Sequence, residues 1–139
     1  MWERPFATGS RGRPPAVDIC LFDDANGIET RVEFGEFSPN KLKSDANKLN
    51  DLTGDALEEY PSVASFIVLW DIRKVKMTVK QRRERMRAFV DAAEKVRPAT
   101  VSLLSVSGGD LFTSTQSRHH WVAAGLFKVQ ESAQLKARS

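Results

Sequence analysis

The sequence predicts an α/β domain built around one mixed β-sheet, and three observations support this. Segments with the two-residue alternation of strands are interspersed with segments that have the three- and four-residue spacing of helices. They follow the order strand, strand, helix, strand, helix, strand, with a further strand near the end, which is typical of a hairpin followed by a crossover unit. The 139 residues, 41% hydrophobic and 28% charged, suit one globular domain.

The first elements form a β-hairpin. Residues 1–15 contain three prolines, three arginines and two glycines without periodicity, so we expect an irregular arm with a short edge strand near residues 3–8. Residues 16–22 are rich in strand formers, residues 23–27 (Asp-Asp-Ala-Asn-Gly) signal a turn, and residues 28–37 alternate with period two. Two strands around such a turn predict an antiparallel pair.

A helix follows the hairpin. Ser38 suits the N-cap position and Pro39 the first helical position. The dipeptide Thr53-Gly54 predicts the end of this helix. Apolar residues at spacings of four and three predict its buried stripe: Leu42, Ala46, Leu49 and Leu52.

The strongest strand signal lies in the middle of the chain. Residues 65–72 are nearly all apolar and predict a buried strand, with Phe66 and Trp70 in the core. A buried strand over residues 99–106 follows the next helix, and we expect these two strands to pair across the crossover unit.

The second helix begins at a capping box, because Thr78 stands at the N-cap position with Gln81 three residues on. It runs to about residue 96. The residues expected to face inward are Val79, Met86, Phe89, Val90, Ala93 and Val96.

The remaining segments complete the domain. Residues 107–110 (Ser-Gly-Gly-Asp) predict a loop, and residues 121–129 a last strand or an irregular edge. We therefore expect one α/β domain over residues 16–129, between the arm at residues 1–15 and a frayed polar tail at residues 130–139.

Charge is unevenly distributed along the chain, although the net charge is only +3. Residues 18–60 hold 11 acidic and 4 basic side chains, whereas residues 73–87 hold 8 basic side chains and one glutamate. A basic segment of this density indicates nucleic acid as the first partner to test, and a solvated helix face is the alternative. The candidate nucleic-acid-binding residues are Lys80, Arg82, Arg83, Arg85 and Arg87.

Other sequence features concern the location of the protein. The longest nearly uncharged stretch, residues 98–109, has 12 residues, and a transmembrane helix needs about 18–20 apolar ones. No apolar leader is visible at the N-terminus. The single cysteine, Cys20, cannot form an internal disulfide. We therefore expect a cytoplasmic protein without a membrane span.

Two carboxylates in the hairpin are candidate metal ligands. Asp18 lies near the start of the first strand and Glu33 midway along the second, so both can project from one face several ångströms apart. Two carboxylates with room for water suit a Mg²⁺ ion, which can lower the pKa of its water and hold phosphodiester oxygens. The alternative is a pair of solvent-facing edge carboxylates.

The run from Arg13 to Phe22, followed by a turn and by Arg31-Val-Glu33-Phe-Gly-Glu36, resembles the PD-(D/E)xK nuclease superfamily. The order of the downstream elements is similar too, so the resemblance covers roughly residues 14–106. It implies a restriction-endonuclease-like core, with Asp18 as the first metal ligand and Glu33 as the second. Glu36 would be an outer helper.

Two departures from the family pattern matter. The family's lysine position falls on Gly35, so the cation would have to come from elsewhere, and Lys41 and Lys43 in the following helix are nearest in sequence. The family's helix before the first strand is replaced by the arm at residues 1–15. One face of the sheet would then lack cover, and a homodimer is the simplest way to supply it.

These observations leave three hypotheses. The first is a small restriction-endonuclease-like domain that acts as a Mg²⁺-dependent DNA phosphodiesterase. The second is a catalytically inactive relative, which Gly35 favours, serving as a nucleic-acid-binding or protein-interaction module. The third is a homodimeric structural protein whose basic helix is merely solvated.

Overall fold

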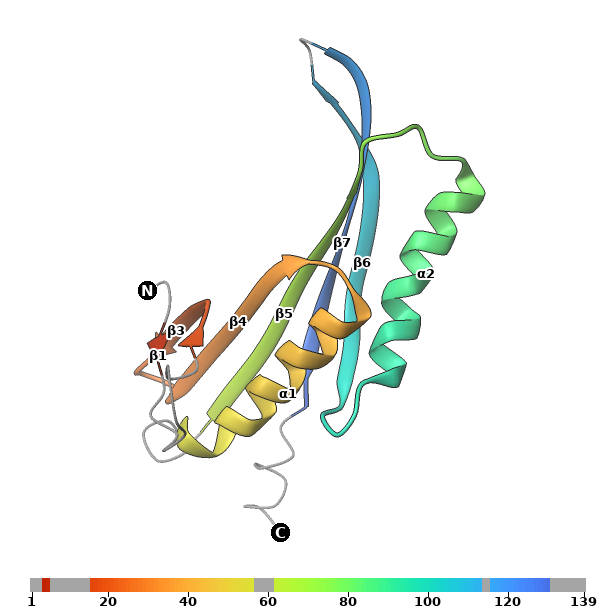
Figure 1. Ribbon diagram of the computed structural model, residues 1–139. Helices are drawn as coiled ribbons and strands as arrows, with labels where there is room; N and C mark the ends of the chain where they lie inside the picture. Colours follow the sequence, from red (N-terminus) through yellow and green to blue (C-terminus); the bar gives the residue numbers. More distant parts are fainter. Residues whose placement is uncertain (1–3, 6–15, 57–61, 114–115, 131–139) are drawn as a thin grey trace.

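Two helices lie on a five-stranded mixed sheet in the computed structural model, which describes residues 4–5, 16–56, 62–113 and 116–130 (Figure 1). The α/β class with a mixed sheet is therefore confirmed. Neighbouring strands are antiparallel, except that β4 runs parallel to β5. In sheet order the strands are β3 (Ile19–Asp23), β4 (Ile28–Glu36), β5 (Ser62–Arg73), β7 (Gln116–Val129) and β6 (Val101–Thr113).

The predicted hairpin is present. Strands β3 and β4 pair antiparallel around a turn in which Gly27 has a φ of 65°, a conformation that glycine adopts without strain. A separate pair joins β1 (Arg4–Pro5) to β2 (Ala16–Val17), which places a short strand within the expected arm. The rest of that arm and the tail after Gln130 lie outside the described residues.

Helix α1 (Pro39–Ala56) connects β4 to the parallel strand β5. Its start is confirmed, because the Ser38 hydroxyl accepts a hydrogen bond from the Lys41 N–H at 3.0 Å. The predicted end was wrong: the helix continues through Thr53-Gly54. A single glycine costs a helix only about 1 kcal/mol, which packing of the apolar stripe can offset.

Helix α2 (Val79–Lys95) has the predicted capping box. The Gln81 N–H donates to the Thr78 hydroxyl at 3.1 Å, and the Thr78 N–H donates to the Gln81 side chain at 2.9 Å. The expectation that Val79 and Val90 face inward was wrong, because they are 63% and 38% exposed. The helix is rotated so that it buries Phe89, Ala92 and Ala93.

The expected pairing of β5 with β6 was also wrong. Strand β7 lies between them, and β6 is at the edge of the sheet. The expected loop at 107–110 continues β6, which forms a long hairpin with β7. Gly108 permits this, because a Cβ atom there would lie 3.1 Å from the ring of Trp121 on β7.

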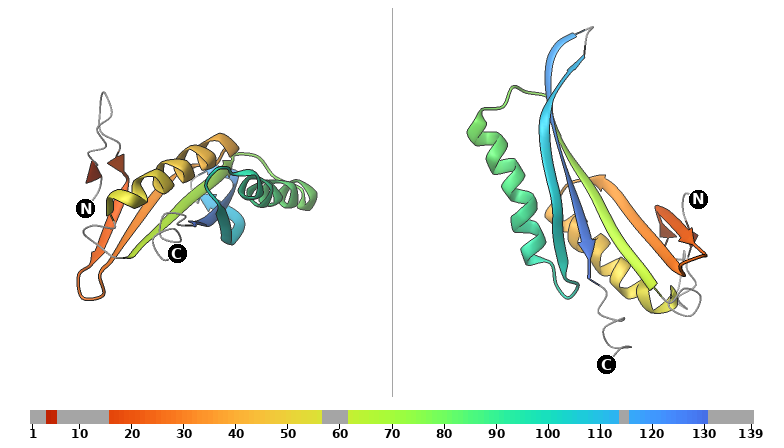
Figure 2. Two further views of the ribbon diagram at one scale, coloured as in Figure 1. Left: turned by 90° about the horizontal axis from the view of Figure 1, so that it is seen from below. Right: turned by 180° about the vertical axis from the view of Figure 1, so that it is seen from behind.

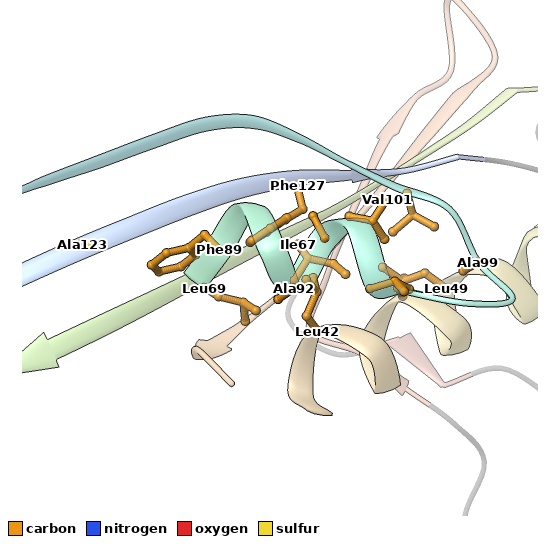
Figure 3. Packing of buried hydrophobic residues seen from close by; sticks show 14 of the residues in the cluster. Leu42, Leu49, Ile67, Leu69, Phe89, Ala92, Ala99, Val101, Ala123 and Phe127 are labelled. Atoms are coloured by element: carbon orange, nitrogen blue, oxygen red, sulfur yellow. The ribbon is translucent and has the colours of Figure 1, made fainter. Parts of the chain in front are cut away.

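Both helices pack on the same face of the sheet (Figure 2). The core lies between them and the odd-numbered side chains of β5 and β7 (Figure 3). Gly125 brings α2 close to β7, since a Cβ atom there would lie 2.7 Å from the ring of Phe89. The largest apolar side chains of this core are Trp121, Phe89, Phe127, Leu42, Leu49, Ile67 and Leu69.

No described helix or strand lies over the opposite face of the three central strands, which we call the open face (Figure 2). The placement of Phe66 and Trp70 in the core was therefore wrong: both are only half-buried and lie on this face. Strand β5 is apolar on both sides, but the helices cover one side. The large apolar residues of the open face are Val32, Phe34, Phe66, Val68, Trp70, Ile72, Val122 and Leu126.

Candidate functional site

The structure brings Asp18 and Glu33 together. Asp18 lies between β2 and β3, where its Oδ2 accepts a hydrogen bond from the Phe34 N–H at 3.1 Å. Glu33 points from β4 toward the helices and is 1% exposed. The two side chains are hydrogen-bonded to each other. The carboxyl pair expected from the hairpin is thus a close pair, half-covered by α1.

Helix α1 supplies cations to this pair. The amine of Lys48 contacts Oε1 of Glu33. One turn away from it, Asp45 is 3.0 Å from the amine of Lys41. These three positions follow a spacing of four and three residues, parallel to the buried apolar stripe of the same helix.

Lys48 and Asp45 were not identified from the sequence. The same helical spacing that revealed the apolar stripe could have shown that Lys41, Asp45 and Lys48 share one side of α1. What the spacing leaves open is the rotation of that helix about its axis, which decides whether this side meets β4 or solvent.

Lys41 occupies the space next to Gly35. A Cβ atom at Gly35 would lie 2.9 Å from Cε of Lys41 and 3.5 Å from its amine. Gly35 follows Glu33 by two residues on the strand, so both positions face α1. The amine of Lys41 therefore lies beside the second candidate ligand, where a side chain at position 35 would otherwise project.

The carboxyl pair titrates unevenly. Burial and the hydrogen bond to Asp18 raise the pKa of Glu33 to about 7, although Lys48 acts to lower it. Partial burial also acts to raise the pKa of Asp18. It is outweighed by the hydrogen bonds from Glu33 and Phe34 and by the lysine charges, so the pKa of Asp18 lies below its usual value. Glu33 is therefore the member of the pair that gains and loses a proton near neutral pH.

Partial burial acts to lower the pKa of Lys41, but nearby carboxylates more than compensate. The hydrogen bond and charge of Asp45 are the main contributions, followed by the charges of Glu33 and Asp18. The pKa of Lys41 is therefore above its usual value. Its amine stays positively charged throughout the neutral range.

The other residues proposed for this site lie elsewhere. Lys43 lines a hollow of about 390 Å³ between α1 and α2, together with Asp91 and Lys95. Glu36 is on the opposite side of β4 from Glu33 and lines a separate hollow of about 200 Å³. Neither side chain joins the carboxyl pair.

The basic residues of α2 fall into two groups. Arg82 pairs with Asp110 at 3.0 Å, and Arg85 donates from Nε to Asp71 at 2.7 Å. These two guanidinium groups are thus engaged within the chain, whereas the other three are exposed. The exposed group is Lys80, Arg83 and Arg87.

A hollow of about 490 Å³ lies beside the exposed group. Arg83 and Arg87 border it, and its floor is apolar. The floor residues are Met86, Val90 and Val106.

The donor set at the carboxyl pair fits one kind of metal. Mg²⁺ is commonly held by one or two carboxylates and keeps several waters, so Asp18 and Glu33 suffice for it. Among the described residues, no three His, Cys, Asp or Glu side chains gather so that they could hold a metal ion. A metal that requires three or four protein ligands therefore does not fit this part of the chain.

Comparisons of the chain with protein families, curated proteins and solved structures found no match. No helix in the described part of the chain is long and apolar enough to cross a membrane. Function must therefore be inferred from the geometry of the site itself.

Proposed function

We propose that this chain is a small restriction-endonuclease-like domain that hydrolyses DNA phosphodiester bonds with Mg²⁺. The observation that carries the proposal is the position of Lys41 beside Gly35. In the nuclease family that the sequence resembles, the lysine stands two residues after the second acid. Here that position has no side chain, and Lys41 from α1 fills the neighbouring space, close enough to Asp18 and Glu33 for their charges to interact.

Each residue has a chemical role in this proposal. Asp18 and Glu33 would hold Mg²⁺, which, when bound, supplies an activated water and neutralises charge on the phosphate. Lys41 places a permanent positive charge where negative charge develops on the phosphate oxygens. Lys48 contacts Glu33 and orients it, while Asp45 orients Lys41.

The nucleic acid would meet the exposed basic residues of α2. Lys80, Arg83 and Arg87 are available to phosphates, whereas Arg82 and Arg85 are engaged with carboxylates. The proposed DNA contact is therefore narrower than the run of five basic residues in the sequence. We also place the protein in the cytoplasm, since Cys20 is a free thiol in the core.

A second function is favoured by the ion pair between Lys48 and Glu33. This contact neutralises a candidate ligand within the chain, so the site is satisfied without a metal. A domain that kept the fold and lost the chemistry would show such a closed arrangement. In this alternative, the chain binds nucleic acid or a protein partner without cleaving.

The decisive experiment compares two lysines of one helix. We expect the wild-type protein to cleave DNA with Mg²⁺ or Mn²⁺, and Lys41→Ala to lower the rate by roughly a hundredfold, as for loss of one charge-stabilising group. Lys43→Ala is the matched control, because Lys43 lies two residues away but faces the hollow between the helices. Its rate should equal that of the wild type.

Two results would contradict the nuclease. One is a wild-type protein that binds DNA without cleaving duplex or single strands at any pH between 6 and 9, which supports the non-catalytic module. The other is equal loss of activity in Lys41→Ala and Lys43→Ala, which removes Lys41 from the proposed role. Circular dichroism checks that both variants remain folded.

A further inference from the structure

The open face is a large apolar surface. Phe34 and Ile72 are 37% and 47% exposed on it, and the rings of Phe34 and Trp70 stack with their centroids 6.2 Å apart. Three strands about 4.8 Å apart, with about seven residues along each, give a face of roughly 330 Å² in projection. Its accessible area is larger, because side chains roughen it. It lies in the size range of the largest apolar patches on monomers, which are often functional.

Charge is confined to two corners of this surface. Among the residues of β4, β5 and β7 that are in register across β5, the charged side chains on the open face are Glu36 and Lys128. Glu36 lies level with Trp70 at one end, and Lys128 lies level with Phe66 at the other, on the far side of β5. The charges are opposite and the surface between them is neutral.

These two corners are related by a simple symmetry. Val68 lies on β5 midway between Phe66 and Trp70, and therefore midway between the two charged corners. A two-fold axis in the plane of the interface, passing over Val68 and diagonal to the strands, exchanges the two positions. It places Glu36 over the partner's Lys128 and Lys128 over the partner's Glu36. The sheets then cross at a steep angle, as in orthogonal sheet packing.

We propose that the open face is the interface of a homodimer, in which two copies of this chain stack sheet on sheet about this axis. Each residue at such an interface contacts its counterpart reciprocally. The apolar side chains of the open face form the centre, and the two Glu36–Lys128 pairs close opposite corners. A polyanion does not fit here, because the surface offers one positive and one negative charge.

The dimer does not depend on the proposed nuclease activity. The Asp18–Glu33 pair lies on the helix-covered side of the sheet, so both copies of the site remain on the outside of the assembly. Loss of cleavage would leave the dimer untouched, and loss of the dimer would leave each site complete. The two proposals therefore fail separately.

Charge exchange tests the interface. We expect sedimentation velocity at micromolar concentration to show a dimer. Glu36→Lys and Lys128→Glu should each raise the dissociation constant roughly tenfold or more, because each sets like charges against one another. The double variant Glu36→Lys/Lys128→Glu should restore the wild-type value. Glu94→Lys, an exposed glutamate of α2, is the matched control and should leave the dimer unchanged.

A second variant tests the centre of the interface. Val68→Asp would bury a carboxylate at the axis and should give a monomer, with circular dichroism to check the fold. If Val68→Asp fails to fold, the charge exchanges still decide. A monomeric wild type, or single exchanges that leave association unchanged, would overturn the proposal. So would a double variant that is no tighter than either single variant.

Discussion

The two faces of the sheet do not follow the usual rule that charged side chains are exposed and apolar ones are buried. The face under the helices buries five polar or charged side chains, whereas the open face is almost entirely apolar. The buried polar set on the sheet consists of Glu29, Arg31, Glu33, Ser65 and Asp71. Burial therefore does not sort these strands by hydrophobicity.

Each anomaly has a physical cost that calls for a function. Burying a charge removes it from water, and ion pairs seldom repay that cost in stability. Arg31 and Glu29 pair at 3.3 Å, and Asp71 is held by Arg73 and Arg85, so these charges are compensated within the chain. Glu33 differs, because its pKa is raised to about 7. Its burial therefore disfavours the ionised carboxylate.

The covered face is itself divided. Beneath α2, side chains of β6 and β7 form an apolar core around Phe89 and Phe127, whose ring centroids lie 6.1 Å apart. Beneath α1, the side chains of β4 are charged. The apolar half contains Phe89 and Phe127 of the core, and the charged half contains the candidate site.

The largest expected effect is a difference in stability between truncations on the covered face and on the open face. Phe127→Ala, on the covered face, should lower the free energy of unfolding by about 3–5 kcal/mol, because it opens a cavity in the core. Leu126→Ala is the matched control, since the adjacent residue faces the open side. Its loss should be about 1 kcal/mol or less in the monomer. Urea unfolding at concentrations where the protein is monomeric measures both.

Equal losses of unfolding free energy in Phe127→Ala and Leu126→Ala would contradict this difference between the two faces. They would mean that the open face is packed within a single chain. The proposed dimer interface would then be occupied already.

A smaller effect concerns the buried acid. The pKa of Glu33 is raised on folding, so the folded state holds a proton that the unfolded chain releases at lower pH. Stability therefore falls as the pH rises from about 4.5 to about 7. Glu33→Gln removes this dependence. The free energy of unfolding of the variant, relative to that of the wild type, should therefore rise by on the order of 3 kcal/mol between pH 4 and pH 8.

Urea unfolding at the two pH values measures this gain. Glu94→Gln, at an exposed glutamate of α2, is the control for a general change in charge. A constant difference between Glu33→Gln and the wild type at both pH values would show that Glu33 stays ionised. The charged half of the covered face would then be a compensated ion cluster.

The smallest effect distinguishes the two groups of arginines on α2. Arg85→Gln leaves Asp71 with Arg73 as its remaining ion-pair partner and should cost about 1–3 kcal/mol of stability. Arg83→Gln, two residues away and exposed, should stay within about 0.5 kcal/mol of the wild type. Urea unfolding measures this difference.

For DNA binding we expect the opposite, a larger effect of Arg83→Gln than of Arg85→Gln. Arg83→Gln should lower the slope of log affinity against log salt by about one unit, and Arg85→Gln should leave it unchanged. Filter binding at several salt concentrations measures the slope. A larger change in Arg85→Gln would indicate that the Asp71 contact opens on DNA.

Local features were predictable because neighbouring residues determine them. The hairpin follows from its turn, the start of α1 from Ser38-Pro39, and the capping box of α2 from Thr78 and Gln81. The proximity of Asp18 and Glu33 belongs to the same class, because the hairpin pairs Ile19 with Val32 and so places the two acids together. None of these depends on how distant segments pack.

Contacts between distant segments were predicted less well. Strand β7 lies between β5 and β6 because a long hairpin of many local hydrogen bonds can insert one strand beside β5. The sequence also showed α1 lysines without showing which would reach the acids. Lys48 reaches Glu33 and Lys43 does not, because packing of the apolar stripe fixes the rotation of the helix.

The sequence by itself determined most elements of this protein and the alternation of side chains along each strand, but not the extent of β6 or the end of α1. Only the tertiary structure decided which side of the sheet the helices cover. In β5 both sides are apolar, so the strand pattern is the same whichever side is buried. The choice is made where Phe89 meets Gly125 and where α1 sets its stripe on the sheet, contacts between residues far apart in the chain. That choice buries Glu33 and leaves Trp70 on the open face.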